Sequence, residues 1–178
     1  MRGAAPSFGI TTAITVQTSP APNSTTIFEY TWNAKPSEAA NAVLAFQQFV
    51  ETNLPAEFGA EFVIGQGNTA GELDFGLTGG WYGPANQFDT VIAPFLAQVR
   101  RPDSKNITVG TYINSVQYFG ELGTLSTTAP DSKDTFYAKS LMAPEASPIS
   151  NAALTAFMNY MANQRFQTSL VSCVFLIY

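Results

Sequence analysis

The residue types that usually carry catalysis or hold metals are almost missing from this chain. Its 178 residues include no histidine and a single cysteine, Cys173. The common serine and cysteine nucleophiles need a histidine base, and the common zinc sites need histidine or several cysteines. We therefore predict no catalytic residue and no metal site in this chain, and we interpret Cys173 as a buried strand residue.

A run of small residues near the N-terminus has a composition suited to close contact with a ligand. It extends from Gly3 to Gly9 and leads into a segment rich in β-branched residues. Backbone N–H groups that carry no bulky side chains can approach a phosphate or the edge of a ring system. Pro6 removes one of these donors. An ordinary tight turn has the same composition, so the residues alone leave both interpretations open.

Composition narrows the classes of partner. The chain is 46% hydrophobic and 12% charged, with a net charge of −5 and only eight lysines and arginines. Nucleic-acid binding needs clustered basic residues to neutralise phosphates, so we expect no nucleic-acid partner. No window is apolar for long enough to span a membrane, so we expect no membrane partner. The high apolar share indicates a surface that is buried against a further domain.

The hydrophobic patterns predict an antiparallel sheet. Alternation predicts strands over 10–18, 25–32, 58–64, 72–78, 134–142 and 166–178. Helical spacing predicts helices over 35–52, 86–99 and 147–161, with Pro94 kinking the second. Residues 79–84 are expected to form a loop, and 108–123 are ambiguous. Paired strands separated by single helices indicate an α+β fold, with the helices on one face of the sheet.

A proline-containing segment divides the chain. Residues 19–24, Ser-Pro-Ala-Pro-Asn-Ser, favour an extended linker. We therefore expect residues 1–22 to be the C-terminal end of one domain and residues 23–178 to be part of a second. The glycine-rich beginning and the apolar ending suggest a piece of a larger protein.

Two segments carry a resemblance to a known family. Residues 2–12 read Arg-Gly-Ala-Ala-Pro-Ser-Phe-Gly-Ile-Thr-Thr, and the strand that follows ends in Pro20-Ala21-Pro22. Residues 134–141 read Asp-Thr-Phe-Tyr-Ala-Lys-Ser-Leu. Together these segments resemble the berberine-bridge-enzyme-like FAD-linked oxidases, and most closely the fungal glucooligosaccharide oxidases. Residues 166–178 depart from that family, which has a tryptophan-rich strand and a glycine turn there.

The resemblance implies a fold and a reaction. Residues 1–22 would end an FAD-binding domain, and the rest would form part of a substrate domain. A sugar would transfer a hydride from its anomeric carbon to flavin N5, a tyrosinate-type base would take the hydroxyl proton, and O2 would reoxidise the flavin to give H2O2. The implied cofactor contacts are Gly3, Ala4, Ser7, Phe8, Gly9 and Ile10.

The parts of the family that hold FAD have no match in this chain. The family attaches the flavin through a histidine and a cysteine of an N-terminal domain, and its catalytic tyrosine lies in a C-terminal segment. This chain has no histidine, and Cys173 is in a different place. We therefore expect FAD in the full-length parent, bound by the missing FAD-binding domain, and no tight binding of FAD by this chain alone.

The resemblance also implies where a carbohydrate substrate would bind, on the exposed face of the sheet above the flavin. The matching positions are Glu61, Val63, Tyr112, Tyr118, Tyr137 and Lys139. Carboxylate, ammonium and phenol groups hydrogen-bond to sugar hydroxyls, and tyrosine rings stack on pyranoses. Residues of this kind are also common on solvated sheet surfaces. The family position matching Val63 is usually polar and shapes substrate choice, so valine there indicates a different substrate or an inactive site.

Three hypotheses for function remain. The first is a piece of a secreted FAD-dependent carbohydrate oxidase, which two glycosylation motifs, Asn23-Ser24-Thr25 and Asn106-Ile107-Thr108, suit. The second is a non-catalytic carbohydrate-binding or structural remnant. The third is an unrelated α+β binding module. The sequence does not identify the sugar, nor does it decide between an oxidase and a dehydrogenase.

Overall fold

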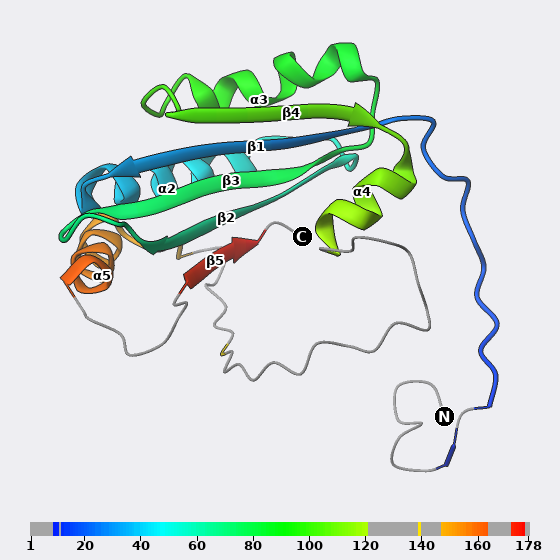
Figure 1. Ribbon diagram of the computed structural model, residues 1–178, viewed down its shortest axis with the longest axis horizontal. Helices are drawn as coiled ribbons and strands as arrows, with labels where there is room; N and C mark the ends of the chain where they lie inside the picture. Colours follow the sequence, from blue (N-terminus) through cyan, green and yellow to red (C-terminus); the bar gives the residue numbers. More distant parts are fainter. Residues whose placement is uncertain (1–8, 11, 121–138, 140–146, 164–171, 177–178) are drawn as a thin grey trace.

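The computed structural model describes residues 9–10, 12–120, 139, 147–163 and 172–176, the last of these by backbone alone. Its elements are β1 (Thr25–Ala34), α2 (Pro36–Val50), β2 (Phe58–Gln66), β3 (Leu73–Trp81), the 3-10 turn η1 (Ala85–Gln87), α3 (Phe88–Leu96), β4 (Ser104–Gly110), α4 (Tyr112–Phe119), α5 (Asn151–Asn163) and β5 (Ser172–Leu176). Figure 1 shows them as a sheet with helices packed against it.

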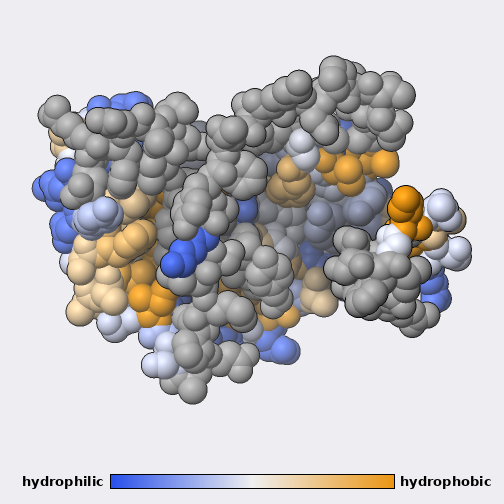
Figure 2. Space-filling model, turned by 90° about the horizontal axis from the view of Figure 1, so that it is seen from below, coloured by the Kyte–Doolittle hydropathy of each residue, from blue (hydrophilic) through white to orange (hydrophobic). Residues whose placement is uncertain are grey.

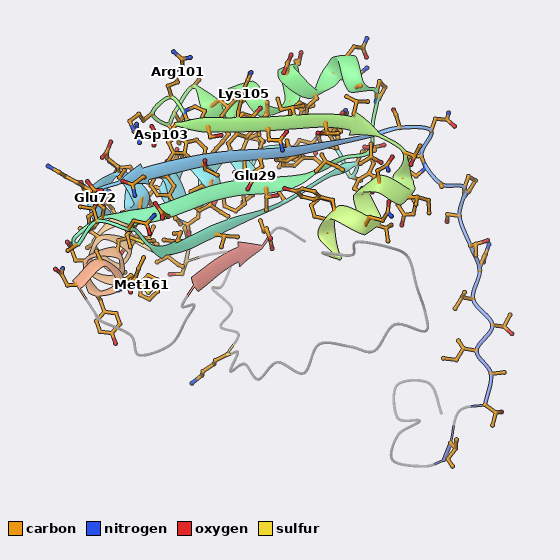
Figure 3. All side chains as sticks on the ribbon, in the orientation of Figure 1. Glu29, Glu72, Arg101, Asp103, Lys105 and Met161 are labelled. Carbon is orange, nitrogen blue, oxygen red and sulfur yellow. The ribbon has the colours of Figure 1, made fainter. Side chains whose placement is uncertain are left out.

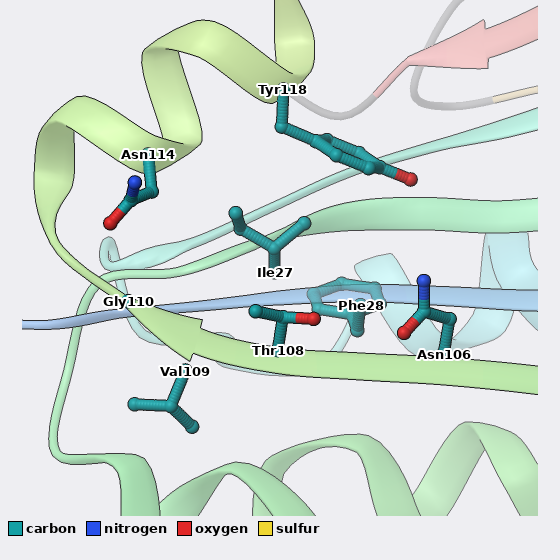
Figure 4. Close-up of a pocket in the computed structure, with 8 residues that line it drawn as sticks. All are labelled: Ile27, Phe28, Asn106, Thr108, Val109, Gly110, Asn114 and Tyr118. Carbon is teal, nitrogen blue, oxygen red and sulfur yellow. The ribbon is translucent and has the colours of Figure 1, made fainter.

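The five strands form one sheet in the order β4-β1-β3-β2-β5, and every neighbouring pair is antiparallel. The long strands β1, β3 and β2 are the centre, and the shorter β4 and β5 are the edges. The predicted α+β fold with an antiparallel sheet is confirmed. Helices α2, α3 and α5 cover one face as expected, whereas α4 lies over one end of the other face (Figures 1 and 4).

The core lies between the sheet and these three helices. Alternate residues of the central strands point into it, among them Trp32 of β1 and Phe62 of β2. The Phe62 ring lies 5.6 Å from Phe46 of α2, and Trp32 packs edge-on against Phe95 of α3 at 6.3 Å. The inward-facing strand residues, which alternate along each strand, therefore pack against the apolar side of the helices in one aromatic cluster.

The boundaries of α2 follow from local sequence. Pro36 occupies the first helical position, where its missing N–H costs nothing, and Glu38 Oε2 accepts a hydrogen bond of 3.4 Å from the Lys35 N–H. The predicted helices over 86–99 and 147–161 are confirmed as α3 and α5. Pro94 lies inside α3, and Leu154, Met158 and Met161 of α5 are buried as core residues.

The strand predicted over 10–18 is wrong. The described residues of this segment have no secondary structure, and Ile10, Ile14 and Val16 are 91%, 79% and 70% exposed. A strand needs a neighbour to accept and donate its backbone hydrogen bonds. None of the described strands pairs with this segment, so its β-branched pattern has no ladder to join.

The loop predicted over 79–84 is also wrong in part, because β3 continues to Trp81. Gly79 makes this possible. A Cβ built on Gly79 would lie 2.2 Å from the Gly59 carbonyl oxygen and 2.6 Å from the Phe28 ring. Only glycine leaves room for that ring over the strand, so the glycine pair marks a close approach rather than a turn.

The ambiguous stretch over 108–123 contains the end of β4 and all of α4. Thr111 caps α4 by accepting a hydrogen bond of 3.3 Å from the Asn114 N–H, while Asn114 Oδ1 accepts one of 2.9 Å from the Thr111 N–H. β5 confirms part of the strand predicted over 166–178. The strand predicted over 134–142 lies outside the described residues, apart from Lys139, which belongs to no element.

Candidate functional site

The face of the sheet opposite α2, α3 and α5 is the candidate site, and we call it the open face. It consists of the outward positions of β1 to β4: Ile27, Glu29, Thr31, Asn33, Gly59, Glu61, Val63, Gly65, Asp74, Gly76, Thr78, Gly80, Ser104, Asn106, Thr108 and Gly110. Figure 3 shows Glu29 on this face, with α2 behind the sheet. Most of these residues are partly or fully exposed.

Four polar side chains line up across the open face. Strand register places Asn106 of β4 opposite Glu29 of β1, Glu29 opposite Thr78 of β3, and Thr78 opposite Glu61 of β2. We call this the polar row. Neighbouring strands lie about 4.8 Å apart, so the two glutamates, separated by one strand, are about 10 Å apart at their Cα atoms. A ligand lying across the row meets carboxylate, hydroxyl and amide groups in sequence.

Glycines beside the polar row keep the surface low. Gly76 lies in the next row between Thr31 and Val63, and Gly59 has no atom within 4 Å of a built Cβ. Glycine in a strand lets a ligand approach the backbone closely. The open face is therefore shallow on both sides of the polar row, where these glycines lie.

A hollow of about 390 Å³ lies between α4 and the β4 end of the open face (Figure 4). Its lining residues are Ile27, Phe28, Asn106, Thr108, Val109, Gly110, Asn114 and Tyr118. Tyr118 reaches from α4 over the sheet, near buried Ile27. This volume lies within the range of small-molecule sites, and an aromatic ring with nearby amides and a hydroxyl suits a compound with both apolar and polar faces.

Charge on the open face is of one sign. Glu29, Glu61 and Asp74 are its only ionisable residues, and none of the sixteen positions named above is a lysine or arginine. Asp74 Oδ1 accepts a hydrogen bond from Asn33 Nδ2. Helix α4, Tyr112–Phe119, has no charged residue. The described part of the open face is therefore anionic.

Arg100 lies beyond one end of the sheet, bound to other groups. Its guanidinium donates hydrogen bonds of 2.8 and 2.9 Å to the two Asp103 oxygens and one of 3.0 Å to the Asn33 carbonyl. The hydrogen bonds from Arg100 and from the Asn33 N–H lower the pKa of Asp103, and the same pairing raises the pKa of Arg100. This group ties the end of β1 to the loop before β4; we call it the Arg100 clasp.

Tyr30 is the other group with a displaced pKa, and it points into the helix-covered face. Burial is the main cause and the nearby Asp89 carboxylate the second, and together they raise the pKa of Tyr30 to about 12. A phenol held neutral in this way is a core residue rather than a base. Among the described residues, no group of three or more histidine, cysteine, aspartate or glutamate side chains is placed to hold a metal.

The sequence-based substrate candidates separate into three groups. Glu61 and Val63 both lie on the open face, in adjacent rows. Tyr112 and Tyr118 are on α4 rather than on a strand; Tyr118 lines the hollow, and Tyr112 lies 6.2 Å from the Tyr82 ring. Tyr137 lies outside the described residues. Lys139 is exposed and in no element, so the expectation that it shares a strand face with Tyr137 has no support in the described residues.

The cofactor candidates do not form a site in the described residues. Gly3, Ala4, Ser7 and Phe8 lie outside them. Gly9 and Ile10 are exposed, and in Figure 1 the segment that joins them to β1 extends beyond the sheet. A flavin needs close, pre-shaped contacts with backbone and side chains. Gly9 and Ile10 by themselves do not form such a pocket, and the role of the six candidates as cofactor contacts stays a prediction.

Several residues of the site were not singled out by sequence reasoning. For Glu29 and Thr78 the signal was present: polar residues alternate with large aromatic ones through β1, so Glu29 had to face away from the core. Asn106 and Asn114 were harder to find. Their roles depend on the short β4 and α4, and the small and polar residues of this stretch fit strand and helix almost equally well.

Exposed apolar side chains gather near the hollow. Ile113, Val116 and Phe119 of α4 are 50%, 37% and 43% exposed. Figure 2 shows hydrophobic surface on both sides of the molecule, and part of it lies toward the right-hand end, where Figure 1 places α4 and the N-terminal segment. Among the described helices, none has both the length and the apolar character required to cross a membrane. This end of the molecule therefore has apolar surface next to its candidate site.

The fold is shared with one class of solved structures, the oligosaccharide oxidases and berberine-bridge-enzyme-like proteins. Sequence comparison adds nothing, since no family model and no curated protein matches the chain. Chitooligosaccharide oxidase matches over 84% of this chain at 22% identity with a TM-score of 0.68. Those residues are only 30% of the chitooligosaccharide oxidase chain.

Two further structures give the same result. Glucooligosaccharide oxidase from Acremonium strictum matches over 85% of this chain at 20% identity, with a TM-score of 0.66. Physcomitrella patens BBE-like 1 matches over 82% at 22% identity, also with a TM-score of 0.66. In both, the matched part is 31% of the solved chain. One study of the Acremonium enzyme concerns its 6-S-cysteinyl, 8α-N1-histidyl FAD. The similarity shows a shared fold over about three tenths of these larger proteins.

Proposed function

We propose that this chain is the substrate-binding part of an FAD-dependent oxidase that acts on a carbohydrate hydroxyl. The open face carries the proposal: a polar row and an adjoining hollow, in the fold of solved oligosaccharide oxidases. In the proposed reaction the sugar CH–OH loses two electrons and two protons and becomes a carbonyl. O2 accepts both electrons and both protons and becomes H2O2.

The chain's own residues would bind and orient the sugar. Glu29 and Glu61 would accept hydrogen bonds from sugar hydroxyls, and the Asn106 amide can both donate and accept. Tyr118 would place its ring against the apolar face of a pyranose at the hollow. None of these groups is proposed as the catalytic base.

FAD would be held by another part of the protein. The chain has no histidine for the double covalent attachment named for glucooligosaccharide oxidase. A partner domain would also cover the exposed apolar side chains of α4. We propose that residues 1–22 belong with that domain, because Ile10, Ile14 and Val16 are exposed and unpaired in the described chain.

Carbohydrate binding by the purified chain tests the core of this proposal. Titration with neutral cello-, malto- and chito-oligosaccharides, followed by NMR or calorimetry, should give saturable binding. An Asn106→Ala and Tyr118→Ala double variant should weaken it, whereas Glu51→Gln, at the end of α2, should not. Failure of every oligosaccharide to bind a folded sample contradicts the proposed function.

The separate prediction on FAD uses the same sample. Added FAD should pass through a desalting column unbound, because the chain has no histidine for covalent attachment of the flavin. A protein fraction with stoichiometric flavin absorbance would contradict this part and leave the carbohydrate proposal in place.

We also propose that the parent is a secreted glycoprotein. Both sequon asparagines, Asn23 before β1 and Asn106 on β4, are exposed. We assign the glycan to Asn23, because a glycan on Asn106 would occupy the proposed sugar site. Expression through a eukaryotic secretory pathway, followed by intact-mass measurement before and after glycosidase treatment, tests it. An unmodified mass would contradict glycosylation.

A further inference from the structure

We infer that the open face selects carbohydrates by charge, favouring sugars that carry a protonated amine over neutral ones and rejecting sugars that carry a carboxylate. This inference rests on the proposed function and names the class of substrate that the same site would take. It starts from the observation that the ionisable residues of the described open face, Glu29, Glu61 and Asp74, are all acidic.

The two glutamates of the polar row are available to a ligand. Both side chains are partly exposed, and within the described part of the chain no hydrogen bond or ion pair engages either carboxylate. They stand on either side of Thr78, about 10 Å apart at their Cα atoms. A pyranose lying across Thr78 is smaller than this gap, so an amine on either side of the ring would come near one carboxylate.

The five described cations do not offset this charge. Arg101 is exposed in the loop before β4, away from Glu29 in Figure 3, and Lys139 is exposed and belongs to no element. Arg100 is bound in its clasp to Asp103 and lies 3.5 Å from Glu38. Lys105 pairs in register with Tyr30, so alternation turns it to the helix-covered face. Lys35 caps α2. No cation of the described residues forms an ion pair with Glu29 or Glu61, so an ammonium group on the ligand would meet carboxylates that these residues leave free.

The hollow beside the row supports a sugar rather than a simple cation. A small metal ion needs several converging oxygen ligands, and the described residues contain no such group of three acidic or histidine side chains. Tyr118, Asn106 and Thr108 instead provide a ring surface and neutral hydrogen-bonding groups next to Glu29. The arrangement is suited to a ligand that has both a ring and a positive charge.

The strength of the selection follows from exposure. Ion pairs at partly exposed sites contribute only a small favourable free energy of binding, and salt reduces it further. We therefore expect glucosamine oligomers to bind about fivefold to tenfold more tightly than neutral oligomers of equal length at low ionic strength, and most of this advantage to disappear at high ionic strength. Oligogalacturonates, which are acidic, should bind more weakly than either.

The experiment compares three trimers on the full chain: cellotriose, the glucosamine trimer and trigalacturonate. Binding is measured by NMR titration at about pH 5.5, where amines are protonated and glutamates ionised. Each titration is run at about 20 mM and about 200 mM salt. The Glu29→Gln and Glu61→Gln double variant removes both charges at nearly constant shape, and Glu51→Gln removes one charge from the end of α2 as a matched control. Thermal melting of all variants confirms that they fold.

The expected result is a salt-sensitive preference for the glucosamine trimer that the double variant loses and the Glu51→Gln control keeps. The double variant should weaken binding of the glucosamine trimer more than binding of cellotriose, since an amide still hydrogen-bonds to hydroxyls but does not attract an ammonium group by charge. Equal, salt-insensitive binding of the glucosamine trimer and cellotriose overturns the inference and leaves the proposed function standing. Tighter binding of trigalacturonate also overturns it. No binding of any trimer overturns the proposed function, and the inference with it.

Discussion

The two faces of the sheet are built from the same strands and differ in almost every property. Residues that face α2, α3 and α5 are large, apolar and buried, whereas those of the open face are small or polar and mostly accessible. One position along a strand separates the two environments, as between Phe62 and Glu61. Alternate positions along each strand therefore serve different purposes: one set stabilises the fold, and the other faces a ligand. A substitution at one position should change the free energy of unfolding, whereas one at the next position should change ligand binding.

The largest expected effect is on the helix-covered face. Phe62→Ala removes a fully buried ring that contacts Trp32, Phe46, Phe75 and Phe95. We expect a loss of about 3–5 kcal/mol in the free energy of unfolding, from lost burial and the cavity left behind. Urea unfolding followed by circular dichroism measures it. A loss below about 1 kcal/mol would show that the ring cluster is not the stabilising core.

The glycine pair of β3 compares the two faces at adjacent residues. Gly79→Ala pushes a methyl group against the Gly59 backbone and the Phe28 ring, whereas Gly80→Ala meets only the Tyr82 side chain, 3.2 Å away. We expect Gly79→Ala to cost about 1–3 kcal/mol and Gly80→Ala clearly less, because a tyrosine can rotate and a backbone cannot. Equal melting temperatures for the two variants would contradict this division.

The Arg100 clasp should contribute less, and in a pH-dependent way. Asp103→Asn removes the carboxylate that accepts two hydrogen bonds from Arg100, and because the pair is exposed we expect a loss of about 0.5–1 kcal/mol. The folded pKa of Asp103 lies below its unfolded value of about 3.9. Its stabilisation is therefore present at neutral pH and is lost as pH falls through the folded pKa.

Unfolding of the original chain and of Asp103→Asn, measured at about pH 7 and about pH 2.5, checks the sign. The difference between them should shrink in acid. A difference that grows in acid would mean that the carboxylate is not held ionised by the clasp.

The smallest effect on stability is expected on the open face. Val63→Thr exchanges a partly exposed side chain for one of similar size with a hydroxyl, so the free energy of unfolding should change by less than about 0.5 kcal/mol. Oligosaccharide affinity should rise instead, because the hydroxyl adds a hydrogen-bonding group beside Glu61. Unchanged affinity in the same NMR titration would place the ligand away from the β2 side of the face.

Much of the central sheet was predictable because its signals are strong and local. The aromatic alternation in β1 and the apolar stripe of α2 needed no knowledge of neighbours. The N-terminal segment shows the limit: Ile10, Ile14 and Val16 follow a strand pattern, but a pattern does not supply the partner strand that makes a ladder. The prediction that Glu61 and Val63 share one face of their strand is confirmed. Their role in binding a substrate stays a prediction.

The hollow could not be found from sequence by the same means. Its walls come from Ile27 near the start of the domain and from Tyr118 of α4, and the space between them depends on how α4 packs on β1. No periodicity encodes such a distance between elements. The aromatic residues of 108–123 are evident in the sequence, but their arrangement around a cavity depends on tertiary packing.

The strand order has a consequence for how the domain is made. The central strands β1, β3 and β2, with the α2 helix that packs on them, are complete once Trp81 has left the ribosome, whereas the edges β4 and β5 follow later. Assembly during synthesis can therefore proceed from the middle of the sheet outward. Until β5 arrives, the free edge of β2 is open to strands of other nascent chains, so the growing domain should need a chaperone most during that interval.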